Sequence, residues 1–143
     1  MAPGSGEVWS SKLLESFQEW LEAGEPAVPR DNTQLFSGED FDGDLTGLAT
    51  FGSMCDKARS SAVISLTNSR TVNGAVVAHE MCHNLGFNHD GGEFNDCPEV
   101  GFVMNGCATF GGCGCCACAR VYVCGRRRKG GRRERSPMVP FFS

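Results

Sequence analysis

The sequence lacks a hydrophobic run long enough to cross a membrane. No stretch of 18 consecutive apolar residues occurs among its 143 residues, whereas a transmembrane helix needs about 20. The first 30 residues also lack the apolar segment of a signal peptide, because residues 1–11 are small and polar and residues 11–21 are interrupted by charges. We therefore expect neither a membrane span nor a signal peptide within this chain.

Basic residues are scarce in most of the chain and concentrated at its end. Residues 1–119 contain 5 Lys and Arg against 16 Asp and Glu, a net charge of −11, whereas residues 120–143 contain 8 against 1, a net charge of +7. The basic stretch 126–135 is compatible with binding to nucleic acid, heparin or another anionic surface, or with a processing site. A solvated, disordered tail is the favoured interpretation, and nucleic acid is not an expected partner.

Histidine is also scarce, and its placement is the main signal in the sequence. The three histidines, His79, His83 and His89, all lie within residues 79–90. His79 and His83 are four residues apart, so on a helix both imidazoles lie on one face and can bind one ion. Gly86 can end the helix with a sharp turn that brings His89 back to the same ion.

Three imidazoles with one open position are the ligand set of a catalytic zinc site, not a closed structural one. Glu80, next to the first ligand, is placed to accept a proton from a zinc-bound water. The alternative is an amphipathic helix that carries histidines without a metal. The fixed spacing of the third histidine and the absence of histidine elsewhere favour zinc.

Cysteine, in contrast, is abundant. The chain has nine, three in the body and six within residues 107–124. This density favours an oxidising compartment, hence secretion, and disulfide bonds. An odd count leaves at least one thiol free or paired with another chain.

Apolar periodicity predicts an α/β fold with two helices and three short strands. The helices are expected over residues 8–21 and 74–85, the second one apolar on most sides and therefore buried, and the strands over 33–36, 48–54 and 62–67. Residues 68–73 are expected to be a polar connection, and residues 37–47 an acidic loop. Asp40, Asp42 and Asp44 in that loop could bind calcium in a loose site, but they fit no EF-hand, and a solvated turn is favoured.

The last part of the chain carries weaker signals. Glycines bracket Met104 in residues 101–106, which predicts a tight turn with the methionine buried at its tip. Residues 107–118 and 125–135 are low-complexity and show no helical or strand period. We expect a catalytic domain over 1–106 and a Cys-rich, basic and disordered tail over 107–143.

The pattern HExxHxxGxxH, followed by a methionine turn, resembles the metzincin zinc peptidases. Asp90, directly after the third histidine, resembles the adamalysin or reprolysin branch, which includes venom and arthropod salivary enzymes. Residues 31–38 and 47–55 are similar to the strands that lead into and border the cleft of that family. Among these enzymes, the arthropod salivary type is the most similar in the overall character of its sequence.

The resemblance implies a partial metzincin catalytic domain, in which a small mixed sheet packs on the active-site helix. The family's first two strands and first helix, and the long helix after its methionine turn, have no counterpart in this sequence. Cys82 stands where the family usually has a small residue between two zinc histidines. The chain therefore resembles a truncated fragment with an irregular C-terminal part.

The resemblance also implies a function. The chain would be a zinc-dependent metalloendopeptidase that cleaves polypeptides outside the cell through a zinc-bound water, with Glu80 as the general base. The alternative is an inactive zinc-binding fragment. The family's edge strand, here Leu48, Ala49, Thr50 and Phe51, would hold the peptide by strand addition, and Met104 would form a hydrophobic floor beneath the metal.

The family's disulfides imply a partner for Cys55, and two further cysteines are candidates for a local pair. Cys55 would connect the edge strand to the end of the domain, with a substitute partner among residues 113–124. Cys97 would pair locally, and Cys107 is one candidate partner. The connectivity stays open, because sequence alone does not fix it.

Overall fold

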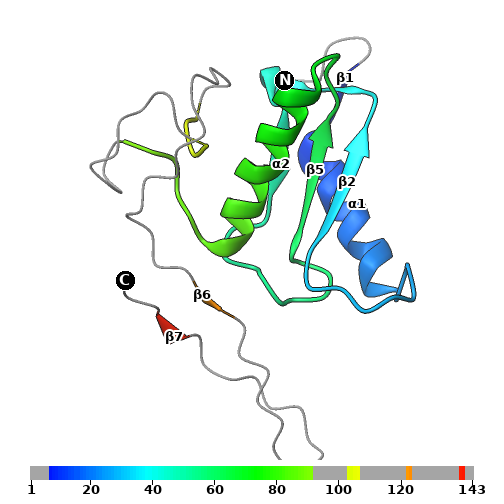
Figure 1. Ribbon diagram of the computed structural model, residues 1–143. Coiled ribbons are helices and arrows are strands. Elements are labelled where there is room, and N and C mark those ends of the chain that lie inside the picture. Colours follow the sequence, from blue (N-terminus) through cyan, green and yellow to red (C-terminus); the bar gives the residue numbers. More distant parts are fainter. Residues whose placement is uncertain (1–6, 92–102, 107–121, 124–138, 141–143) are drawn as a thin grey trace, which may run out of the picture.

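The computed structural model describes residues 7–91, 103–106, 122–123 and 139–140 of the 143-residue chain. Its main elements are helices α1 and α2 and a three-stranded sheet (Figure 1). Their bounds are α1 Ser10–Glu22, β2 Thr33–Ser37, β4 Gly47–Ala49, β5 Ser61–Ser65 and α2 Arg70–Leu85. Two short strands, β1 Glu7–Val8 and β3 Asp40–Phe41, form a separate parallel pair, and β6 Tyr122–Val123 pairs antiparallel with β7 Val139–Pro140.

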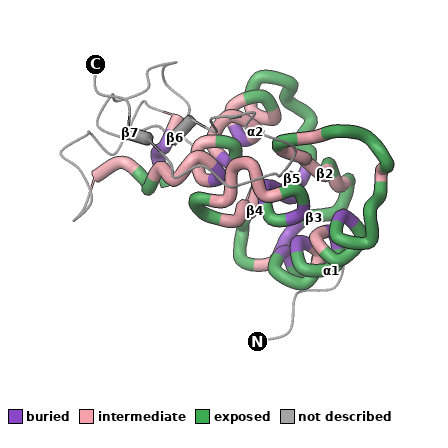
Figure 2. Tube along the Cα trace, turned by 90° about the horizontal axis from the view of Figure 1, so that it is seen from below, coloured by how far each residue is buried: buried purple, intermediate pink, exposed green. Residues whose placement is uncertain are grey.

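The sheet is mixed and has the order β2-β5-β4. β2 and β5 are parallel, with Thr33 opposite Ser61, and β4 is antiparallel to β5, with Leu48 opposite Val63. All five residues of β5 are buried, because the strand has a neighbour on each side and a helix on each face (Figure 2). β4 therefore forms one edge of the sheet in the described part of the chain.

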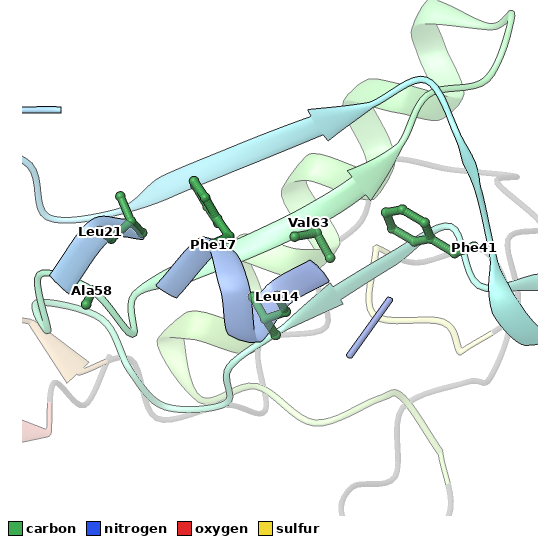
Figure 3. Packing of buried hydrophobic residues seen from close by; sticks show 6 residues of the cluster. All are labelled: Leu14, Phe17, Leu21, Phe41, Ala58 and Val63. Carbon is green, nitrogen blue, oxygen red and sulfur yellow. The ribbon is translucent and has the colours of Figure 1, made fainter. Parts of the chain in front are cut away.

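The core lies between α1 and one face of the sheet (Figure 3). Leu14, Phe17 and Leu21 recur at helical spacing on α1 and are buried with Val63 of β5. Side chains alternate along a strand, so Ala62 and Ile64 point to the opposite face, where α2 packs (Figure 1). The α/β fold and the packing of a small mixed sheet on the histidine helix are therefore confirmed.

The N-terminus of α1 is capped from a distant loop. The Asp42 carboxylate accepts hydrogen bonds from the Ser10 backbone N–H at 2.7 Å and from the Ser10 hydroxyl at 2.8 Å. These bonds hold the pKa of Asp42 below its ordinary value of 3.8. A carboxylate is favoured at a helix N-terminus, where backbone donors lack helical partners.

The acidic loop is consequently more structured than predicted. Residues 37–47 contain β3 and a 3₁₀ turn at Asp42–Asp44, because Val8 pairs with Phe41 and Asp42 binds Ser10. A turn is present as predicted, but the short strand β3 beside it was not predicted. The calcium prediction remains a prediction.

The predicted bounds of two other elements need correction. The strand expected over 48–54 ends at Ala49, because the chain turns there and residues 52 and 54 donate to the end of α2. The helix expected from Gly74 begins at Arg70, where the Ser69 hydroxyl caps it by accepting from the N–H of Val72. The polar connection predicted over 68–73 is therefore mostly helix.

Helix α2 is less buried than its apolar sequence suggested. Only Val76, Glu80 and Asn84, which are four residues apart and form one stripe, are buried, and Met81 on another face is 37% exposed. Burial therefore follows the stripe that faces the sheet, and the prediction of burial on most sides was wrong. The helix ends at Gly86, whose φ of 93° is easy only for glycine.

Among the described residues, no helix is both long and apolar enough to span a membrane. The predictions for Cys97, Cys107 and the basic stretch 126–135 fall outside the described residues.

Candidate metal centre

The three histidines converge at the end of α2. His79 and His83 lie one turn apart on the helix, and the turn at Gly86 returns the chain so that His89 faces both. Nε2 of His89 lies 3.1 Å from Nε2 of His79 and 3.1 Å from Nε2 of His83. The sequence-predicted trio is thus brought together at one point.

The hydrogen bonds of the other ring nitrogens define the tautomers. Nδ1 of His79 lies 2.7 Å from the carbonyl oxygen of Val103, and Nδ1 of His83 lies 2.8 Å from that of Phe87. A carbonyl oxygen can only accept, so both Nδ1 atoms carry the proton and donate it. The Nε2 atoms of His79 and His83 in their neutral form are therefore unprotonated and present lone pairs to His89.

This arrangement fits a zinc ion. Nitrogens bound to tetrahedral zinc at 2.0–2.1 Å are about 3.3 Å apart, close to the observed 3.1 Å. A proton on Nε2 of His89 could satisfy only one of its two short contacts at a time, whereas one cation satisfies all three lone pairs. Donation of Nδ1–H to a carbonyl is also the usual second-shell support of a metal-bound histidine.

Burial keeps two of these imidazoles neutral. Desolvation lowers the pKa of His79 below its usual 6.5, and it lowers the pKa of His83 to about 4, because a charged ring loses its hydration. The bond from His83 to the Phe87 carbonyl opposes this shift without cancelling it. Neutral imidazole is the form that binds metals, so both rings are ready for an ion at neutral pH.

Glu80 is buried beside the histidines. It is only 4% exposed, and its Oε2 has no hydrogen-bond partner among the described residues. Desolvation raises the pKa of Glu80 to about 7. An unpaired carboxylate at such a position is a strong candidate for a functional group, because burial without a partner is costly.

Gly47 makes room for this carboxylate. A Cβ atom added at Gly47 would lie 2.5 Å from Oε1 of Glu80, closer than side-chain atoms approach. The start of β4 therefore lies directly against Glu80. Sequence reasoning placed Gly47 next to the edge strand without identifying this role, because the contact joins residues distant in sequence.

The methionine turn lies against the histidines, and Met104 is buried at 6% exposure. The Met104 carbonyl accepts a hydrogen bond of 2.8 Å from the N–H of Asp90, and the adjacent Val103 carbonyl holds His79. Gly106 lies so close to His89 that an added Cβ would be 3.2 Å from its Nδ1. The turn thus supports the site from the C-terminal side.

A cleft of about 500 Å³ opens over the site. Its lining includes the three histidines, Glu80, the chain from Asp44 to Ala49, and Phe51. Phe51 is 53% exposed, and its ring centroid lies 6.5 Å from that of His83. Of the four residues predicted to bind substrate, Leu48, Ala49 and Phe51 line the cleft.

Thr50, the fourth of these residues, makes its backbone hydrogen bonds within the protein. Its N–H donates to the Ser61 carbonyl, and its carbonyl accepts from Nδ2 of Asn84 at 2.9 Å and from the Ser53 hydroxyl at 2.7 Å. These backbone groups are therefore engaged within the protein. The role of residues 48–51 in substrate binding stays a prediction.

Asn84, which sequence reasoning did not single out, connects the helix to the sheet. Its side chain is fully buried. Nδ2 donates to the carbonyls of Thr50 at 2.9 Å and Ser61 at 3.0 Å, and Oδ1 accepts from Nδ2 of Asn32 at 2.7 Å. Its only signal in the sequence was its spacing, four residues after Glu80 and eight after Val76, on the same stripe of the helix.

The loop after β4 closes the end of α2. Gly52 N–H donates to the His83 carbonyl and Met54 N–H to the Asn84 carbonyl, each at 2.9 Å. Carbonyls in the last turn of a helix lack helical partners, so the loop satisfies them and fixes the distance between β4 and the histidines. The next residue, Cys55, is disulfide-bonded, and its predicted pairing remains a prediction.

This fold and its converging imidazoles place the chain in the class of metzincin zinc metalloprotease catalytic domains. The family model described as Reprolysin (M12B) family zinc metalloprotease matches residues 7–123. The chain therefore belongs to the reprolysin family, as its motif predicted.

Snake metalloproteinases are among its relatives. The chain is 47% identical over 110 residues to zinc metalloproteinase-disintegrin-like atragin of Naja atra, covering 64% of this chain and 18% of that protein. It is 39% identical over 112 residues to snake venom metalloproteinase atroxlysin-1 of Bothrops atrox, covering 69% of this chain and 55% of that protein. The resemblance to venom enzymes is confirmed, the arthropod likeness stays a prediction, and the chain spans only part of each relative.

Proposed function

We propose that this chain provides the active site of an extracellular zinc metalloendopeptidase. His79, His83 and His89 would hold one zinc ion through Nε2, and Glu80 would serve as general base. The observation that carries the proposal is the convergence of three imidazoles beside a buried carboxylate, with Nε2 of His89 at 3.1 Å from Nε2 of each of the other two. When bound, the zinc ion supplies the Lewis acid that polarises a scissile carbonyl.

Glu80 moves the proton in this proposal. Its Oε2 has no other partner among the described residues, so it can accept a proton from the attacking water and return it to the leaving amine. Gly47 positions the carboxylate by allowing β4 to approach it.

The substrate is proposed to be an extended polypeptide. β4 is the edge strand next to Glu80, and no described strand pairs with its outer side. A peptide can therefore add to it as an antiparallel strand, with its scissile bond near Gly47. The relatives named above and the cysteine content support an extracellular location.

Zinc stoichiometry and cleavage of an unfolded protein test this proposal, with Glu80→Ala as the matched variant. We expect one zinc per chain in both proteins and cleavage by the wild type alone. Glu80→Ala should slow cleavage by about 10² to 10⁴. Zinc binding without any cleavage would assign the chain to the alternative, an inactive zinc-binding fragment. Equal cleavage by both proteins would refute the role of Glu80.

A further inference from the structure

Asp44 is the second acidic residue of the cleft and has no assigned role. Apart from the histidines, the charged or titratable side chains that line the cleft in the described chain are Glu80 and Asp44, and no Lys or Arg accompanies them. Asp44 is exposed at the rim. The described residues provide it with no ion pair.

The direction of β4 determines which part of a substrate would pass Asp44. A peptide that pairs antiparallel to β4 runs from Ala49 toward Gly47, so its C-terminal half continues toward Asp44. Gly47 lies against Glu80, which places the scissile bond at this level. Asp44 is three residues further, at the end of the 3₁₀ turn Asp42–Asp44 that precedes β4, and the length of three extended residues sets an upper limit of about 10 Å on this separation. It therefore lies within reach of the first few substrate residues after the scissile bond.

The neighbour of Asp44 indicates which kind of substrate side chain would fit there. Leu45, 43% exposed, lines the same rim. A long basic side chain can lay its apolar stem on a leucine while its charged end reaches a carboxylate. Glutamate would be repelled there, and a short polar residue would contact neither group.

We propose that Asp44 selects substrates with a lysine or arginine shortly after the cleaved bond. This inference rests on the proposed peptidase function. Asp44 is a specificity determinant in this scheme and takes no part in proton transfer. The contact is exposed, so the expected preference for Lys over Gln is about two- to fivefold.

The local backbone dictates the choice of variant. Asp44 has a φ of 59°, a left-handed conformation that Asp and Asn tolerate better than most residues. Asp44→Asn therefore removes the charge while preserving shape and backbone preference. Asp40→Asn is the matched control, because Asp40 is a nearby exposed acid that does not line the cleft.

Peptide binding tests the proposal without requiring turnover. One Lys, or one Gln, is scanned along an uncharged, end-capped peptide, and the Kd is measured on zinc-loaded Glu80→Ala chain. We expect the Lys peptide to bind about two- to fivefold tighter at one or two adjacent positions. The preference should disappear with Asp44→Asn and at roughly 0.5 M NaCl, and persist with Asp40→Asn.

The outcomes separate this inference from the proposed function. A Lys preference that survives Asp44→Asn, or no preference at any position, overturns the role of Asp44. Absence of binding by every peptide also overturns it. Failure of the wild-type chain to cleave, together with a preference that depends on Asp44, would refute the peptidase activity and leave the selective contact intact.

Discussion

The buried amide of Asn84 offers the sharpest test of how the histidine helix is held on the sheet. Replacing it by alanine removes three short hydrogen bonds, of 2.7, 2.9 and 3.0 Å, that join α2 to β5 and to the residues before β2 and after β4. Each is worth about 1 kcal/mol net, and partners left unsatisfied in the interior add to the loss. We expect Asn84→Ala to lower the free energy of unfolding by about 3–5 kcal/mol.

Urea unfolding, followed by the fluorescence of the two tryptophans, measures this loss at a fixed zinc concentration, because bound metal adds to apparent stability. Asn68→Ala is the matched control, since Asn68 is exposed and should change stability by less than about 0.5 kcal/mol.

The expected loss is comparable with the whole stability of a small domain. A milder variant, Asn32→Ala, therefore supplies a second point. It removes the 2.7 Å bond to Oδ1 of Asn84, the 3.0 Å bond to the Ser60 hydroxyl and the 2.6 Å bond from Nε2 of Gln34. Its expected cost is about 2–3 kcal/mol, because Asn32 is half-buried and its former partners can reach water. A loss below about 1 kcal/mol for Asn84→Ala in folded protein would refute the reasoning.

Two further predictions concern the cleft and the cap of α1. Gly47→Ala should displace the Glu80 carboxylate, whose Oε1 would lie 2.5 Å from the new Cβ, and we expect kcat/KM to fall by about 10²-fold with zinc affinity unchanged. The control is Gly74→Ala, at an open site, which should leave cleavage unchanged. Unchanged cleavage by Gly47→Ala would contradict the contact. Asp42→Asn should destabilise the chain at neutral pH, because hydrogen bonds from Ser10 lower the pKa of Asp42. The stability from this lowered pKa is present above its ordinary value of 3.8 and is lost as pH falls through the folded value. The free energies of unfolding of the two proteins should therefore converge in acid. A difference in the free energy of unfolding that does not change with pH would contradict the cap.

The fold was predictable where the signal was local. The spacing of Leu14, Phe17 and Leu21 indicated α1, and the β-branched run around Val63 indicated β5. Interactions between distant segments were not predictable. The early end of β4 depends on the helix C-terminus that residues 52 and 54 satisfy, and the structure of the acidic loop depends on Asp42 binding Ser10.

In the candidate site, too, the local arrangement was predictable and the contacts between distant segments were not. The histidine spacing indicated a shared ion because three residues within one helix and one turn determine it, and the structure brings their Nε2 atoms together. The supports come from elsewhere in the chain. Gly47 against Glu80 and Asn84 with Asn32 are contacts across more than 30 residues, and no spacing rule reports them. For Asp44 the sequence suggested only a position in an acidic loop or a loose calcium site.

X-ray absorption at the zinc edge of the metal-loaded chain tests the central claim most directly. The account predicts one zinc ion with three nitrogen ligands at 2.0–2.1 Å and one light-atom ligand at the open position. Substituting His89 with alanine should remove one nitrogen and weaken binding. A first shell dominated by sulfur at about 2.3 Å, unchanged by His89→Ala, would place the metal on the cysteines and contradict the account.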